Sequence, residues 1–251
     1  TGDRVATADA VRTTWYGTEV FSVSSGGALA YATAPAVESS QLTWVDRQGK
    51  PTSTVGPPGV DGAVSLSRDG KRAVVRDADY DVPGDLWTID LSDGRRTRLT
   101  FGRNNYSPGV WSHDGTRIVF AGAVDGDIEV FSVDVATGRI VRLTNSPRED
   151  ADPSWSPDDS RVVFWSTRDG NPEIYVMRSD GTEPRRLTNN AALDRSPVWS
   201  PDAAKIAFVS ARDGDREVYL VRVIDGRVER LTSGAHATND SPRWSPNGAY
   251  I

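Results

Sequence analysis

The sequence predicts an all-β fold made of four-stranded antiparallel sheets that repeat along the chain. Two sequence features that recur at the same interval support this prediction. The dipeptide Leu-Thr recurs every 44 residues, beginning at positions 99, 143, 187 and 231. A tryptophan follows the threonine of each dipeptide by eleven or twelve residues, at positions 111, 155, 199 and 244. Self-similarity at a fixed period of this length is typical of repeat architectures.

Within one repeat the hydrophobic pattern has the period of a strand. A short first strand at 197–199 ends in the Ser-Pro-Asp turn at 200–202. Alternating, β-branched and aromatic stretches follow at 205–210, 217–223 and 228–232, and Gly- and Asp-containing turns separate them. No segment longer than a few residues has a helical pattern. Each repeat is therefore predicted to form four antiparallel strands.

Four strands repeating every ~40–45 residues are typical of the blade of a β-propeller. The full blades are expected to begin near residues 21, 66, 111, 155 and 199, and a partial one near 244. Residues 1–17 are expected to supply a closing strand or the end of a preceding blade. We predict a single propeller domain over 1–251, with six blades of which the last is incomplete.

The recurring aromatic residues are expected to pack between blades, because a single blade cannot bury both of its faces. This applies to the repeated tryptophans and to Phe120, Phe164 and Phe208. Trp165 breaks the repeat, since the neighbouring units have Ala121 and Val209 there. It is expected to fill a gap between blades, the alternative being an exposed contact.

The sequence motifs of the repeat resemble those of a known family. Copies of a PxWSPDGxRIxF pattern, followed by RDGNPEIYV at 168–176 and RRLTN at 185–189, are similar to the WD40-like repeat of TolB-family six-bladed propellers. The front part, with QLTWVDRQGK at 41–50, resembles TolB-like propellers attached to bacterial serine/threonine kinases. It is also similar in pattern to the propellers that gate prolyl-oligopeptidase-type peptidases. The resemblance implies a periplasmic or extracytoplasmic location.

Composition and motifs argue against several functions. A net charge of -6 disfavours nucleic acid as a partner, and no apolar run approaches the ~20 residues that span a bilayer. The chain has no cysteine and two histidines, of which His113 lies in a repeat turn and His236 in a loop. The motifs of a kinase and of a Ser-His-Asp hydrolase are missing. We therefore expect no catalytic residue, no metal site and no cofactor in this chain.

A set of Asx residues recurs three positions before the proline of each first strand. These residues are Asn105, Asp150, Asp194 and Asn239. In a propeller, the loop before the first strand lies on the face around the central channel, as does the loop between the second and third strands. The Asx residues either cap this loop or form a polar ring that meets a peptide or protein segment.

Residues outside the repeat pattern receive the greatest weight as binding candidates, because symmetry argues for a structural role. Tyr and Arg are also common at binding hot spots. The predicted partner-binding residues on the channel face are Asn105, Tyr106, Arg148, Asp150, Arg168, Asp194, Arg212 and Asn239.

Three functional hypotheses follow. The first is a non-catalytic interaction module that binds a protein or peptide. The second is an accessory propeller of a larger enzyme, whose kinase or peptidase domain would lie outside this chain. The third is a propeller enzyme acting on sugars or lactones, which would need metal ligands converging on the channel.

Overall fold

The computed structural model describes residues 21–23, 29–33, 40–46, 48–59, 63–77, 84–102, 107–233 and 241–251. Within these residues the chain forms strands, turns and short loops, and no helix. The predicted all-β class is therefore confirmed. The closing strand expected in residues 1–17 lies outside the described residues.

The strands form five four-stranded antiparallel sheets, and the strands of each sheet follow one another in chain order. We call these sheets blades I to V. Blade I contains β1 (Phe21–Val23), β2 (Leu29–Thr33), β3 (Ser40–Val45) and β4 (Pro51–Gly59). Blade II contains β5 (Ala63–Leu66), β6 (Arg72–Arg76), β7 (Leu86–Asp90) and β8 (Arg96–Arg98).

The other three blades repeat this order. Blade III contains β9 (Val110–Trp111), β10 (Arg117–Val124), β11 (Asp127–Asp134) and β12 (Ile140–Arg142). Blade IV contains β13 (Asp150–Trp155), β14 (Arg161–Ser166), β15 (Glu173–Arg178) and β16 (Arg185–Arg186). Blade V contains β17 (Asp194–Trp199), β18 (Lys205–Ser210), β19 (Glu217–Arg222) and β20 (Val228–Arg230).

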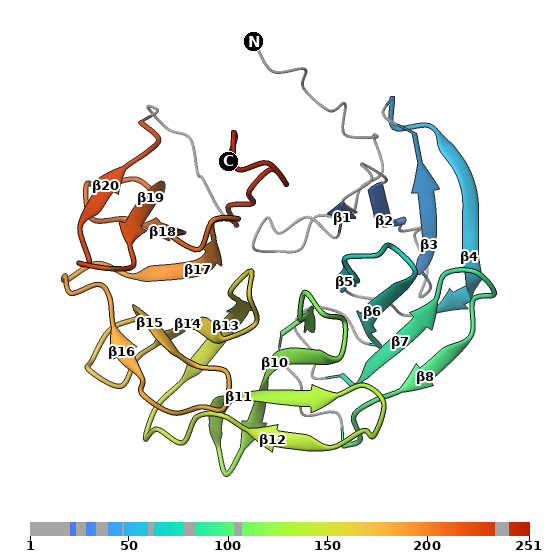
Figure 1. Ribbon diagram of the computed structural model, residues 1–251, viewed down its shortest axis with the longest axis horizontal. Coiled ribbons are helices and arrows are strands. Elements are labelled where there is room, and N and C mark those ends of the chain that lie inside the picture. Colours follow the sequence, from blue (N-terminus) through green and yellow to red (C-terminus); the bar gives the residue numbers. More distant parts are fainter. Residues whose placement is uncertain are drawn as a thin grey trace.

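The blades are arranged in chain order around a common centre, as Figure 1 shows. The first strands of neighbouring blades contact one another, as β13 and β17 do, and β1 and β5. The first strands are therefore innermost, as in a propeller. Residues 241–251 begin another unit, in which the Trp244 indole donates a hydrogen bond to the carbonyl of Val198 (3.4 Å). The total of six blades stays a prediction.

The repeated aromatic residues pack between blades, as predicted. Trp155 of blade IV is 2% exposed, and its indole N–H donates to the carbonyl of Val110 in blade III (3.1 Å). Phe164 is fully buried in a cluster that contains residues of both blades III and IV. Trp165 is also buried, in the cluster between blades IV and V. Its predicted role as a filler between blades is confirmed.

The Leu-Thr marker has a clear structural role within the blade. The hydroxyl of Thr188 accepts a hydrogen bond from the amide of Ile174 (2.9 Å) and donates one to the buried carboxylate of Glu173 (2.6 Å). Arg186 donates to the same carboxylate (2.8 Å). The arrangement recurs in blades II, III and V with the triads Thr100–Asp85–Arg98, Thr144–Glu129–Arg142 and Thr232–Glu217–Arg230. In blades II to V this network ties the last strand to the third.

The Ser-Pro-Asp turns join the first and second strands. Asp158 accepts hydrogen bonds from the Ser156 hydroxyl (2.6 Å) and the Ser160 amide (3.2 Å), and these bonds form an Asx-turn. The side chain of its neighbour Asp159 does not bond its own turn. Asp159 has a φ of 58° and instead accepts the amide of His113 in blade III (2.7 Å). His113 lies in a turn, as predicted, and the contact joins two blades.

Candidate functional site

The loops around the centre of the ring meet at one end of the blades. The loop between β14 and β15 contacts the loop that enters β13, where the Thr167 amide donates to the carbonyl of Glu149 (3.0 Å). It also contacts the start of β17, where the Asp194 amide donates to the carbonyl of Pro172 (2.9 Å). We call this end, formed by residues 145–149, 167–172, 189–193 and 211–216, the channel face.

Asp150 and Arg168 form an ion pair at this face. The Asp150 carboxylate, at the start of β13, lies 2.9 Å from the Arg168 guanidinium, which follows β14. The Arg168 Nε also donates to the hydroxyl of Ser166 (2.8 Å), and its guanidinium carbon lies 4.8 Å from the ring centroid of Tyr175. The Asp150 side chain is fully buried, whereas the Arg168 side chain is 21% exposed.

Blade V repeats this pair 44 residues later. The Asp194 carboxylate lies 2.8 Å from the Arg212 guanidinium, which lies 4.7 Å from the ring centroid of Tyr219. Asp194 is also fully buried, and Arg212 is 21% exposed. Burial raises the pKa of Asp194, and the hydrogen bond from Ser210 and the charge of Arg212 oppose this shift. At both positions the group accessible to a ligand is therefore the guanidinium and not the carboxylate.

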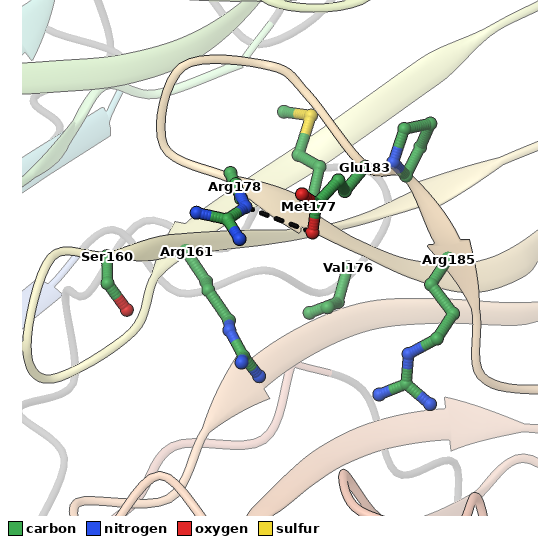
Figure 2. A pocket seen from close by; sticks show the side chains of 8 residues that line it. Ser160, Arg161, Val176, Met177, Arg178, Glu183 and Arg185 are labelled. Carbon is green, nitrogen blue, oxygen red and sulfur yellow. Dashed lines mark ion pairs between the residues drawn. The ribbon is translucent and has the colours of Figure 1, made fainter.

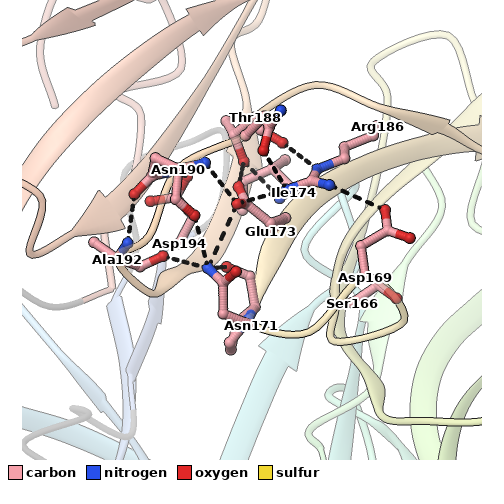
Figure 3. A network of polar contacts seen from close by, with 12 residues as sticks. Ser166, Asp169, Asn171, Glu173, Ile174, Arg186, Thr188, Asn190, Ala192 and Asp194 are labelled. Carbon is pink, nitrogen blue, oxygen red and sulfur yellow. Dashed lines mark hydrogen bonds and ion pairs between the residues drawn. The ribbon is translucent and has the colours of Figure 1, made fainter.

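The two loops on each side of the Asp194 pair are held together by a polar network (Figure 3). The Asn171 side-chain amide donates to the carbonyls of Ala192 (2.6 Å) and Asn190 (3.1 Å). The Asn190 amide in turn donates to Asp194 (2.8 Å), and its backbone N–H donates to Glu173 (2.7 Å). Asp194 thus helps to position the loop that precedes its strand, which agrees with the capping interpretation. The ring interpretation stays a prediction.

Two arginines on this side of the molecule are more accessible. Arg148 is exposed, and its side chain makes no hydrogen bond or ion pair within the described residues. Arg195 is also exposed, and its guanidinium carbon lies 5.0 Å from the ring centroid of Trp165. The Trp165 indole donates to the Asp152 carboxylate (2.9 Å), whose pKa is raised by burial. Asp152, Trp165 and Arg195 form a cluster without a counterpart in the other described blades.

This cluster depends on an irregularity that the sequence pattern did not predict. The pairing register of β13 shifts between Ala151 and Ser154, and that of β17 shifts between Arg195 and Val198. Asp152 (φ 49°) and Ser196 (φ 53°) occupy the left-handed region at these two shifts. A β-bulge of this kind changes the direction of side chains and often lies next to a functional site. Because Asp152 and Ser196 are not glycines, no local residue pattern predicted these two bulges.

Some predicted site residues lie outside the described part of the chain, and some buried acids were not predicted. Asn105, Tyr106 and Asn239 lie outside the described residues, as does His236. The sequence pattern also missed the buried acids Asp85, Glu129, Glu173 and Glu217, although they recur every 44 residues like the Leu-Thr marker. That common period was the signal that could have identified them.

Within the described residues, neither a metal-binding group nor a membrane-spanning helix is found. No group of three or more His, Asp or Glu side chains in this part of the chain is arranged to hold a metal ion. No membrane-spanning helix is found there either.

Residues 125–251 match the family model described as the TolB beta propeller domain. The fold is similar to that of a provisionally assigned TolB from Agrobacterium tumefaciens (TM-score 0.72, 26% identity, 91% of this chain and 86% of that one). It is also similar to TolB from Acinetobacter baumannii (TM-score 0.71, 27% identity, 87% of this chain and 55% of that one). No curated protein sequence matches the chain.

An enzyme shares the architecture. The structure of oligogalacturonate lyase from Vibrio parahaemolyticus has a TM-score of 0.72 to this chain, with 17% identity, and the match covers 98% of this chain and 72% of the lyase. At this identity the similarity concerns the fold alone.

Proposed function

Because this chain belongs to the TolB β-propeller domain family, we propose that it is a non-catalytic interaction module that binds a protein or peptide segment at the channel face. One observation carries this proposal. In both Asp–Arg pairs the carboxylate is fully buried while the guanidinium stays partly exposed. The channel face therefore offers positioned hydrogen-bond donors to a partner.

Arg148 and Arg195 extend this set of donors. Each has an exposed side chain, and a planar guanidinium can bind a carboxylate or a backbone carbonyl with two parallel hydrogen bonds. Arg is enriched among residues that dominate binding energies. We expect the partner segment to supply acceptors to Arg148 and Arg195.

The surrounding loops are well suited to binding because they are already ordered by contacts within the chain. Asn171 and Asn190 join the β14–β15 loop to the loop before β17, as described above. A site whose loops are held in place loses less conformational entropy when a partner binds. Loops on a rigid scaffold are also where binding residues are concentrated in many folds.

The proposal can be tested with peptides selected on the purified chain from a random peptide library. The dissociation constant of each selected peptide is measured by fluorescence anisotropy for the wild type and for the double variant R148A/R195A. We expect binding to the double variant to be at least ~10-fold weaker, which corresponds to a loss of about 1.4 kcal/mol.

R139A is the matched control. Arg139 is an exposed arginine in the turn between β11 and β12, at the opposite end of blade III. Its removal should leave peptide binding unchanged. Peptides that lose affinity with R139A and retain it with R148A/R195A would place binding elsewhere and contradict the proposal.

A second candidate function is that of an accessory propeller in a larger enzyme. The resemblance of the front part of the chain, including QLTWVDRQGK at 41–50, to kinase-attached propellers and to peptidase-gating propellers favours it. The discriminating observation is the coding sequence on either side of this chain. A protein-kinase domain before it would favour a sensor role, and a G-x-S-x-G hydrolase domain after it would favour a gating role.

Three further properties belong to this proposal. We propose that the chain carries no catalytic residue of its own and needs no cofactor. We propose a protein or peptide as its partner, rather than nucleic acid, because of the net charge of -6. An extracytoplasmic location is proposed from the family resemblance alone.

A further inference from the structure

A cavity of about 490 Å³ lies in blade IV, at the opposite end from the channel face. Its lining comes from the start of β14, the end of β15 and the turn before β16. Arg185 reaches across to blade V, where its Nη2 donates to the carbonyl of Val223 (2.6 Å). The cavity therefore lies beside the junction of blades IV and V, and its volume is within the range of small-molecule sites.

Arg161, which lines this cavity, differs from its counterparts in the repeat. Arg72 and Arg117 stand six residues after the first-strand marker of their units, as Arg161 does. Their guanidinium carbons lie 4.6 Å and 4.4 Å from the ring centroids of Trp111 and Trp155 in the following blade. The Arg161 guanidinium has no ring contact, hydrogen bond or ion pair within the described residues.

The tryptophan of the following blade shows the same difference. Trp199 is 5% exposed, and its indole nitrogen has no hydrogen-bond partner in the described part of the chain. The corresponding nitrogens of Trp111 and Trp155 donate to carbonyls of the preceding blade (3.2 Å and 3.1 Å). The contacts that close the two earlier junctions are thus not made between blades IV and V.

Arg185 adds a second positive charge, which three of the other described blades lack. The equivalent positions in blades II, III and V hold Thr97, Val141 and Glu229. Arg178 and Glu183 also line the cavity, but they pair with each other (3.0 Å). The charges left without a carboxylate partner are therefore those of Arg161 and Arg185.

Figure 2 shows the side chains of Arg161 and Arg185 extending in the same direction, with Val176 between them. Val176 is 4% exposed and gives the cavity an apolar floor, whereas the side chain of Met177 points to the other face of β15. A compact anion is best held by donors that converge on one point. Two cationic groups on either side of an apolar surface instead match two carboxylates joined by a hydrocarbon linker.

We propose that this cavity binds an aliphatic dicarboxylate, with one carboxylate on Arg161, the other on Arg185 and the linker over Val176. The dicarboxylate is either a free small molecule or two acidic side chains of a peptide. This site is separate from the channel face, so it stands or falls independently of the function proposed above.

The test measures ligand binding to the full chain by calorimetry and by the shift in the thermal unfolding midpoint, at constant ionic strength. The probes are glutarate, adipate, the monocarboxylate butyrate and inorganic phosphate. We expect a saturable rise of the midpoint with glutarate or adipate, and at least a tenfold weaker response to butyrate and phosphate. A peptide with two glutamates that binds more tightly than the free dicarboxylates would assign a protein as the source.

Arg161→Gln is the decisive variant, because its side chain makes no contact whose loss would unfold the chain. It should weaken dicarboxylate binding at least tenfold, and Arg161→Lys should recover part of the loss. R139Q should bind like the wild type, and Glu183→Gln should bind at least as tightly. The proposal is overturned if no dicarboxylate shifts the midpoint of the wild type, or if Arg161→Gln responds as the wild type does.

Discussion

Arg117 of blade III lies over the indole ring of Trp155 in blade IV, with its guanidinium carbon 4.4 Å from the ring centroid. The same indole donates a hydrogen bond to the preceding blade and is almost fully buried. Burial, a hydrogen bond and a cation–π contact thus act at a single junction. A cation–π contact of this kind contributes about 0.5–2 kcal/mol, so burial of the indole is the larger effect.

Trp155→Ala should therefore destabilise the chain by about 3–5 kcal/mol, because it leaves a large cavity between two blades. The free energy of unfolding from urea titration measures the loss. Trp244→Ala is the matched control, since Trp244 is only partly buried and should cost less. An unchanged midpoint for Trp155→Ala would refute the inter-blade role.

Thr188→Val should cost about 2–4 kcal/mol. Valine has the shape of threonine, but it cannot donate to Glu173 or accept from the Ile174 amide, and both groups are buried. Thr182→Val, in the exposed turn between β15 and β16, should cost less than about 1 kcal/mol. Urea unfolding of both variants checks the difference, and equal losses would mean that the buried network contributes little.

Arg168→Ala and Arg148→Ala should separate structural from binding roles on the channel face. Arg168→Ala leaves the Asp150 carboxylate buried without its cationic partner, which typically costs about 3–5 kcal/mol. Arg148→Ala removes an exposed side chain and should stay within about 0.5 kcal/mol of the wild type. Differential scanning calorimetry tests this. A stable Arg168→Ala protein would show that the pair is not needed for folding.

Gly181→Ala should be far more damaging than Gly214→Ala. Both glycines have positive φ values, 87° and 110°, so each alanine is strained by about 1–2 kcal/mol. At Gly181 an added Cβ would also lie 2.4 Å from the carbonyl oxygen of Leu143, whereas at Gly214 it would meet no atom within 4 Å. The difference in unfolding free energy isolates the contact between the β15–β16 turn and blade III. Equal losses would show that this turn can move away.

Tyr219 should make stability fall at alkaline pH. Burial, and then the hydrogen bond to Asp213, raise the pKa of Tyr219 from its ordinary value of 10.0 to about 12. The folded state then holds the phenol proton more tightly than the unfolded chain does. The contribution is complete below pH 10 and is lost as the pH rises to about 12.

The comparison is between the wild type and Tyr219→Phe, each unfolded with urea at a series of pH values. Above pH 10 the free energy of unfolding should fall more steeply for the wild type. Parallel curves would mean that Tyr219 ionises as easily in the folded protein as in the unfolded chain.

Much of the fold could be predicted because its markers lie close together in the chain. The interval between Thr144 and Thr188 defines the blade, and the alternation in 205–210 defines a strand. The capping role of Asp158 was also predictable, because its partners lie within two residues. The acceptor role of Glu173 was not, because Thr188 comes next to it only when the third and fourth strands pair.

Local sequence pattern and period were sufficient for the all-β class, the four-stranded unit and the aromatic packing between units. Packing of the blades decided which charges remain accessible. In the sequence, Asp150 and Asp194 look like the many aspartates that are exposed. In the structure, each is fully buried against an arginine 18 residues later in the chain. Asp159 bonds a turn in another blade, and Arg161 lacks the ring contact that its counterparts make. Period alone cannot distinguish such residues, because desolvation and contacts between blades depend on where neighbouring repeats place their side chains.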